Sequence, residues 1–293
     1  MSLFYFDSLL QVLGSTIIEL SIEHVSHSIS CVIIPQCIHK PPLQVIYSSQ
    51  NFIVVLKPPD VTEVALWKKL TEQLDNVGDR DTQRAIFRRC FQSDNGFSGL
   101  YPVAVNKLAS GALKNALAEI NHRRRLHTYY VAIVKGLVEQ PEIKIDAQIG
   151  RDLRFKNPIV RMCTNIDWEH CFNPCDCTTE VVLVETGYFD EEFSSKVVLK
   201  SYRDDRKQQF RVHLKEVGHP LVGDTIYDES HHPKTDHLMI ELIRVRSMNS
   251  VENLFVDSED PFTVEKLSGR WRVKDTVLQL QDALEKLDSL EAF

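Results

Sequence analysis

The sequence predicts an α+β fold in which a mainly antiparallel sheet carries flanking helices. Short runs rich in β-branched and aromatic residues, typical of strands, are interspersed with stretches that repeat apolar residues at helical spacing. The two kinds of segment do not alternate regularly, so a doubly wound parallel sheet is not expected.

The first two strands are predicted to form a hairpin. Residues 45–47 and 52–56 are apolar and rich in valine and isoleucine, and four polar residues, 48–51, separate them. Residues 57–59, Lys-Pro-Pro, end the second strand, because proline has no amide hydrogen to donate.

Helices and strands follow in turn. Residues 65–74 and 113–120 have helical spacing, and an arginine-rich stretch follows the second helix, where positive charge suits the helix dipole. Residues 129–134 predict a strand that Gly136 closes. Residues 179–184 and 196–199 predict two further strands.

The last part of the chain contains a sharp turn and an amphipathic helix. Residues 210–217 lead into the turn Gly218-His219-Pro220. Residues 275–290 predict a helix that packs against the domain as a flank, and a helix that binds a partner is the alternative. Its apolar stripe consists of Val277, Leu280, Leu284 and Leu287.

Two regions are predicted along the chain. Residues 1–42 form an N-terminal extension of unclear structure, which ends in a Lys-Pro-Pro sequence that breaks regular structure. Residues 43–293 form one domain, including the C-terminal helix.

The charge is unevenly distributed. The chain carries a formal net charge of −7, whereas nucleic-acid-binding proteins usually present a basic surface. Residues 84–130, however, hold eight Lys or Arg residues and only two acidic ones. This window predicts a basic face that attracts a polyanion, and a solvated helix face is the alternative.

Seven cysteines and the absence of a basic leader predict an intracellular protein with free thiols, cytoplasmic or nuclear, with a mitochondrial location left open. No uncharged run reaches membrane-spanning length. Four cysteines lie close together with His170. Their spacing matches no common zinc pattern, so free thiols in a loop are favoured over a metal site. These cysteines are Cys163, Cys171, Cys175 and Cys177.

One long segment closely resembles a known family. Residues 211–227 contain Arg-Val-His, then Gly-His-Pro, then Gly-Asp and a tyrosine, an order that resembles the C-terminal motif of RluA-type RNA pseudouridine synthases. In that motif the Arg-Val-His is expected to be a strand. Just before it, Arg206 and Gln209 match the family's Gly-Arg-Thr-His-Gln.

Two further segments carry the resemblance. Residues 52–58 resemble the family's opening strand, which runs into Lys-Pro, and residues 130–136 resemble its Tyr-x-Ala-x-x-x-Gly strand. Further details resemble an animal group of the family, the RNA pseudouridylate synthase domain-containing proteins. The resemblance covers about residues 45–287 and implies the pseudouridine synthase fold, with a central cleft.

The family's catalytic segment, His-Arg-Leu-Asp-x-x-Thr-Ser-Gly, can be placed in two registers. Residues 91–99 put Asp94 at the catalytic position, and residues 103–111 put Asn106 there. The first register is preferred because it supplies a carboxylate. It also leaves room for a helix before Tyr130.

The resemblance implies the chemistry of the site. The family breaks the N1–C1′ bond of a uridine in RNA, turns the uracil and rejoins it through C5, without cofactor or metal. Asp94 would be the catalytic carboxylate, Arg211 its ion-pair partner, and Tyr130 the residue that stacks on the flipped base. Further RNA-binding residues are expected to hold the nucleotide or the phosphates. They are Gln92, Arg206, Gln209, Arg88, Arg89, Arg123, Arg124 and Arg125.

Departures from the family pattern leave alternatives open. Phe91, Gln92 and Ser93 stand where the family has His-Arg-Leu, Phe97 where it has Thr, and Thr128 where it has Lys. A catalytically weak or inactive RNA-binding relative is therefore the second hypothesis, and a protein-interaction module is the third. The expected partner is ribosomal, transfer or messenger RNA, bound by a monomer without contact to a membrane.

Overall fold

The computed structural model describes residues 43–59, 61–75, 88–89, 96–117, 126–155, 161–203, 207–228 and 237–289. The predicted N-terminal extension, residues 1–42, lies outside these ranges. Within them no helix is long and apolar enough to cross a membrane.

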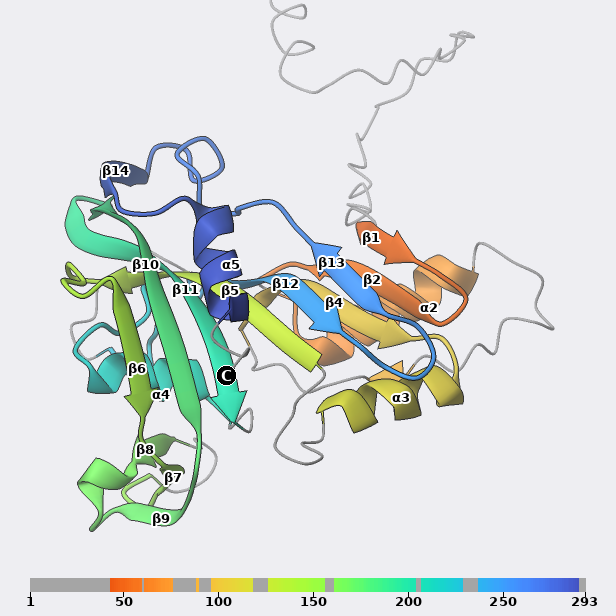
Figure 1. Ribbon diagram of the computed structural model, residues 1–293, viewed down its shortest axis with the longest axis horizontal. Coiled ribbons are helices and arrows are strands. Elements are labelled where there is room, and N and C mark those ends of the chain that lie inside the picture. Colours follow the sequence, from red (N-terminus) through yellow and green to blue (C-terminus); the bar gives the residue numbers. More distant parts are fainter. Residues whose placement is uncertain are drawn as a thin grey trace, which may run out of the picture. The chain divides into compact units, whose positions relative to one another are not determined.

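A large sheet forms the body of the described domain, as predicted (Figure 1). Its main path runs β1-β2-β4-β12-β5-β11-β10-β14, with β13, β3 and β6 attached to β12, β4 and β10. The strands are β1 (Val45–Ser48), β2 (Phe52–Lys57), β3 (Arg88–Arg89), β4 (Ser98–Ala104), β5 (Leu126–Lys135), β6 (Glu142–Asp146), β10 (Thr178–Phe189), β11 (Glu192–Arg203), β12 (Ile240–Ser247), β13 (Leu254–Asp257) and β14 (Trp271–Thr276).

The pairing is antiparallel at every junction of these described strands except one, where β12 runs parallel to β4. β4 and β5 follow one another in the sequence, but β12, from late in the chain, lies between them. The predicted α+β class with a mainly antiparallel sheet is confirmed.

The predicted hairpin is formed by β1 and β2, with Ser48 opposite Ile53. Ser49 organises its turn, because the Ser49 hydroxyl oxygen accepts hydrogen bonds from the amides of Asn51 at 3.1 Å and Phe52 at 3.0 Å. A serine that bonds the backbone in this way stabilises a tight turn without a glycine.

Four α-helices lie in the described residues: α2 (Glu63–Asp75), α3 (Lys107–Leu117), α4 (Gln209–Glu216) and α5 (Leu280–Ser289). Helix α2 confirms the prediction for residues 65–74. Helix α3 begins six residues before the predicted start at 113. The cause is Asn106, whose Oδ1 accepts a hydrogen bond from the Ala109 amide at 2.8 Å and so caps the helix.

The Arg-Val-His segment lies in helix α4, so the expectation of a strand was wrong. Phe210, Val212 and Leu214 alternate with polar residues, which imitates the two-residue period of a strand. In the helix the intervening Arg211 and His213 are buried too. Both find polar partners, and the helix therefore shows no exposed polar residue before Lys215 that would have revealed its period.

The C-terminal helix is shorter than predicted, because residues 271–276 form β14 and α5 begins at Leu280. Val277 is 47% exposed and does not belong to the buried stripe. Ala283, Leu284 and Leu287 are buried against the sheet, so the prediction that this helix is a packed flank is confirmed.

The two faces of the sheet carry separate cores. Tyr130 packs in one, together with buried residues of α3 and α4. Its neighbour Tyr129 packs in the other, together with buried residues of α5. Successive residues of a strand point to opposite faces, so β5 contributes to both cores.

All four clustered cysteines had been expected in a loop, but the structure places only Cys177 in one. Three of them lie on the strands of a second, three-stranded sheet, β8-β7-β9, and Cys177 directly precedes β10. All four are free thiols. Burial and the neighbouring Cys171 raise the pKa of the Cys163 thiol to about 12. The strands are β7 (Ile149–Asp152), β8 (Met162–Thr164) and β9 (Cys171–Cys175).

Candidate active site

Three aromatic rings meet on one face of the sheet. The Tyr130 ring of β5 lies 5.0 Å from the Phe210 ring of α4 and 5.6 Å from the Phe97 ring, centroid to centroid. Phe97 and Phe210 stack with an interplanar angle of 22°. Tyr130 is 6% exposed, and edge contacts of this kind hold an aromatic ring in one orientation.

Arg211 lies on α4 next to Phe210 and forms a buried bidentate ion pair with Asp224. Its Nε donates to Asp224 Oδ2 at 2.8 Å, and its Nη2 donates to Oδ1 at 2.6 Å. The two side chains are 7% and 0% exposed. A planar guanidinium held by two parallel hydrogen bonds has a fixed position and orientation.

Asp224 is fixed in turn by the backbone that follows it. Its Oδ1 accepts hydrogen bonds from the amides of Ile226 at 2.9 Å and Tyr227 at 3.0 Å. The Tyr227 ring lies 5.2 Å from the Arg211 guanidinium carbon, and burial raises the pKa of its hydroxyl. The Gly-Asp-x-x-Tyr part of the motif therefore forms a support for Arg211.

A chain of hydrogen bonds joins α4 to β10. Gln209 Nε2 donates to the Thr178 carbonyl and to Thr179 Oγ1, both at 3.0 Å. Thr179 Oγ1 lies 2.8 Å from His213 Nδ1, and His213 Nε2 lies 2.9 Å from the Ala147 carbonyl, to which it donates. Burial lowers the pKa of His213, so the neutral imidazole fits this chain.

Lys57, at the end of β2, holds the backbone within the predicted catalytic segment, residues 91–99. This lysine is 4% exposed, and its Nζ donates to the Phe97 carbonyl at 2.6 Å and to the Pro58 carbonyl at 3.2 Å. The Lys-Pro motif and the segment that contains Asp94 are thus connected by a buried hydrogen bond three residues after Asp94.

The Ser-Gly pair after Asp94 lies where β4 meets β12. The Ser98 hydroxyl donates to the Ile240 carbonyl at 3.1 Å and lies 3.2 Å from Glu241 Oε2. Gly99 has a φ of +100°, and a Cβ there would lie 2.3 Å from the Leu242 carbonyl oxygen. Only glycine fits such a close approach of two strands. Burial raises the pKa of Glu241 to about 7.

The structure brings together only part of the predicted site. Tyr130, Arg211 and Gln209 lie on β5 and α4, as described above. Arg88 and Arg89 form β3, whose backbone pairs with Ala104 and Val103 of β4. The other predicted residues lie outside the described ranges, and their roles stay predictions. They are Asp94, Gln92, Arg206, Arg123, Arg124 and Arg125.

Sequence reasoning missed three contributions. Phe97 appeared only as a departure from the family threonine, Asp224 was assigned to a turn, and the contact of Lys57 with the Phe97 carbonyl was not foreseen. Asp224 and Lys57 lie within the matched motifs, and that position was the available signal. Among the described residues, no group of three or more His, Cys, Asp or Glu side chains could hold a metal ion.

Comparisons with known proteins show relatives over most of the chain. RNA pseudouridylate synthase domain-containing protein 1 of Danio rerio is 31% identical over 253 residues, which cover 84% of this chain and 83% of the relative. The chain belongs to the RluA-type family of RNA pseudouridine synthases. The dual-specificity RNA pseudouridine synthase RluA of Vibrio parahaemolyticus is 26% identical over 198 residues, covering 64% of this chain and 70% of that protein.

A solved structure supports the same assignment. Human RNA pseudouridylate synthase domain containing 1 superposes with a TM-score of 0.74 at 30% identity, covering 84% of this chain and 95% of that one. No family model matches the sequence. The pseudouridine synthase fold predicted from the three motifs is confirmed.

Proposed function

We propose that this protein is an RNA pseudouridine synthase that isomerises uridine to pseudouridine through the carboxylate of Asp94. The observation that carries the proposal is the arrangement around Arg211. Its guanidinium is held by a buried fork to Asp224, and the residue before it on α4, Phe210, packs against Tyr130 in the aromatic cluster. The two relatives reported above carry names that refer to this reaction.

The reaction needs an ionised carboxylate next to the ribose in a site that excludes water. Desolvation raises the pKa of an aspartate above its ordinary value of about 3.9 and opposes ionisation. A fixed guanidinium offsets this effect. We propose that Arg211, oriented by Asp224, supplies that positive charge to Asp94, which attacks C1′ or removes the 2′ proton.

Isomerisation moves one bond and one proton. The N1–C1′ bond breaks, the uracil turns, the C5–C1′ bond forms, and the proton leaves C5 while N1 is protonated. The base must leave its helix to reach the carboxylate, and an aromatic surface favours the flipped state by roughly 1–3 kcal/mol. We assign this surface to Tyr130, which the Phe97 and Phe210 rings hold in place.

RNA binding beyond the target nucleotide is assigned to five arginines. Arg88, Arg89 and Arg123 to Arg125 would bind phosphates and position the RNA without reading its sequence. Arg206, Gln209 and Gln92 would contact the target nucleotide. The substrate is a ribosomal, transfer or messenger RNA, and the enzyme acts as an intracellular monomer in the cytoplasm or nucleus, or in mitochondria.

Pseudouridine mapping tests the proposal. Total RNA is mapped from cells that lack the protein and from cells rescued with wild type or with Asp94→Asn. A uridine that loses its modification and regains it only with wild type supports both the activity and the role of Asp94. If every site persists without the protein, or if Asp94→Asn rescues fully, the inactive RNA-binding alternative takes its place.

A further inference from the structure

A row of three buried side chains crosses the sheet on the face opposite the aromatic cluster. Arg244 of β12 and Lys200 of β11 both pair with Tyr129 of β5, one from each side. Arg244 is 3% exposed, Lys200 0% and Tyr129 1%. A buried cation is stable only where hydrogen bonds or opposite charge replace its water.

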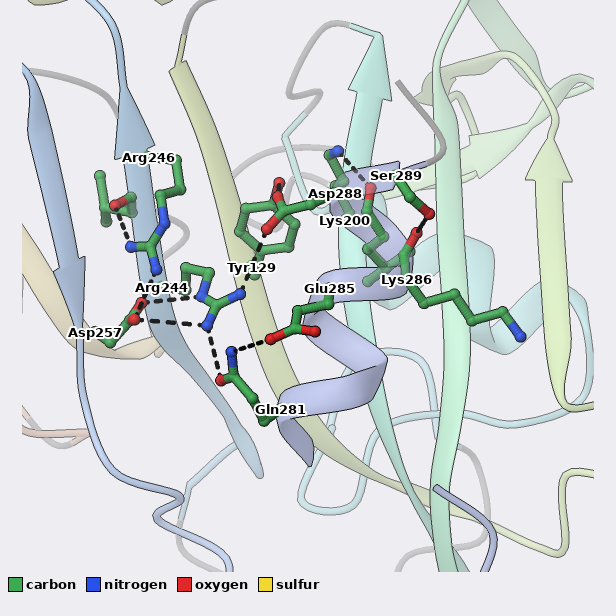
Figure 2. Close-up of polar contacts among 12 residues, drawn as sticks. Tyr129, Lys200, Arg244, Arg246, Asp257, Gln281, Glu285, Lys286, Asp288 and Ser289 are labelled. Carbon is green, nitrogen blue, oxygen red and sulfur yellow. Dashed lines mark hydrogen bonds and ion pairs between the residues drawn. The ribbon is translucent and has the colours of Figure 1, made fainter. Parts of the chain in front are cut away.

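Helix α5 contacts every member of this row through its polar groups (Figure 2). The Tyr129 hydroxyl donates to the Asp288 carboxylate. Lys200 Nζ donates to the Leu287 carbonyl at 2.8 Å. Arg244 donates from Nη1 to Asp288 Oδ2 at 3.4 Å and from Nη2 to Gln281 Oε1 at 2.9 Å.

The last turn of α5 is suited to this contact. The final carbonyls of a helix have no partner within the helix and carry its negative partial charge, so the Lys200 ammonium fits there. A carboxylate at the same end is unfavourable for the helix by itself. The hydrogen bonds from Arg244 and Tyr129 offset this unfavourable interaction of Asp288 with the helix dipole. The Asp288 side chain therefore attaches the helix to the sheet.

The adjacent row of the sheet carries Tyr130. Leu242 and Leu199 pair with Tyr130 from the two sides. Between Leu242 and Arg244 the register of β12 shifts against β5, which indicates a bulge. A bulge disrupts the regular ladder locally. The register of β5 against β12 is therefore interrupted between the two rows, whereas its register against β11 continues without a shift.

We infer that the last turn of α5 positions Tyr130 for the reaction from the opposite face of the sheet. The last turn of α5 holds Arg244, Tyr129 and Lys200, and so fixes the position of β5 next to the bulge. Because Tyr130 follows Tyr129 on β5, the position of the Tyr130 ring is fixed as well. Asp288 and Tyr129 are the positioning residues. This inference rests on the proposed function, because it assigns α5 a part in presenting the stacking tyrosine.

Fluorine NMR tests the positioning independently of activity. The full-length protein is labelled with 3-fluorotyrosine, and the Tyr130 resonance is assigned by its loss in Tyr130→Phe. Asp288→Asn is expected to shift or broaden the Tyr130 resonance. The matched control is Asp282→Asn, the same substitution at an exposed position in the first turn of α5, and it is expected to leave the resonance unchanged.

Kinetics on the substrate RNA give the second measurement. We expect Asp288→Asn and Tyr129→Phe each to lower kcat by about threefold to tenfold, or 0.7 to 1.4 kcal/mol, with little change in KM. The double variant should lose no more than Asp288→Asn alone, because Tyr129→Phe removes only a contact that Asp288→Asn already alters. If Asp288→Asn does not fold, Gln281→Ala removes the other bond between Arg244 and α5, which lies in the first turn of the helix and involves an exposed side chain.

The outcomes are distinct. A Tyr130 resonance that stays in place in Asp288→Asn while the Tyr129 resonance moves would overturn the inference, and so would a kcat equal to that of wild type. A wild-type protein that forms no pseudouridine refutes the proposed function instead. The fluorine spectra then still decide whether α5 positions Tyr130.

Discussion

Replacing Asp224 with asparagine removes one partner of a buried ion pair with almost no change in shape. Asparagine retains an oxygen that can accept from the Ile226 and Tyr227 amides. Its nitrogen, however, then faces Arg211 Nε, which is 2.8 Å from an acceptor oxygen in the wild type. Two donors meet, and the buried guanidinium loses the negative charge of Asp224.

The expected loss of stability follows from the burial of both groups. The side chains of Arg211 and Asp224 are 7% and 0% exposed, so solvent does not replace the lost contact. Breaking a buried pair by removing one partner costs about 3 to 5 kcal/mol. For a domain of this size that corresponds to a fall in melting temperature of roughly 6 to 20 °C. Pseudouridine formation should fall with it, because Arg211 loses its fixed orientation.

Thermal unfolding followed by circular dichroism measures the effect. The matched control is Glu259→Gln, which breaks an exposed pair with Lys266, the two side chains being 89% and 43% exposed. An exposed pair contributes little, so this variant should shift the melting temperature by less than about 4 °C. If Asp224→Asn melts no earlier than Glu259→Gln, the fork does not hold Arg211 as argued.

Three further perturbations test other parts of the site. Lys57→Met should destabilise the protein by about 1 to 3 kcal/mol in urea unfolding, because the buried Phe97 carbonyl loses its donor; equal stability would refute this. Gly99→Ala should abolish soluble folded protein, since its Cβ would lie 2.3 Å from a carbonyl oxygen. The control is Gly111→Ala in α3, where a Cβ has open space, and this variant should raise the melting temperature. Glu241 has a folded pKa of about 7, above its ordinary value of 4.5, so the native state binds the extra proton and stability falls as pH rises from about 4.5 to 7. This fall is on the order of 3 kcal/mol, and Glu241→Gln should remove it. The free energy of unfolding is measured at pH 5 and pH 8, and an equal change in wild type and variant would contradict the prediction.

The elements that could be predicted from the sequence are those whose apolar spacing fits only a strand or only a helix. The hairpin of β1 and β2 alternates around a polar turn, and α2 repeats apolar residues at helical spacing, so both were placed correctly. Helix α4 was mistaken for a strand because Arg211 and His213, which lie between its apolar residues, are as buried as those residues. The start of α3 was missed because it depends on a cap by Asn106, which the sequence alone also allowed as a catalytic position.

The site was predicted in part for a similar reason. Arg211 and Tyr130 could be named because they lie in motifs with a recognisable order. The support given by Asp224 could not, because an aspartate after a glycine is a common turn residue. Only the folded chain brings it against a guanidinium 13 residues away. Phe97 was noted only as a departure from the family threonine. Its contacts with the rings of Tyr130 and Phe210 depend on the packing of α4 against the sheet.

The position of β12 between β4 and β5 has a consequence for synthesis of the chain. A ribosome delivers β4 and β5 more than a hundred residues before β12, so a nascent chain exposes an unpaired edge on each of these strands meanwhile. Exposed edges of this kind invite pairing with other chains. The Ser-Gly segment after Asp94 acquires its neighbour only when β12 emerges. Truncated products that end before residue 240 should therefore aggregate, and the enzyme should become competent only after β12 has left the ribosome.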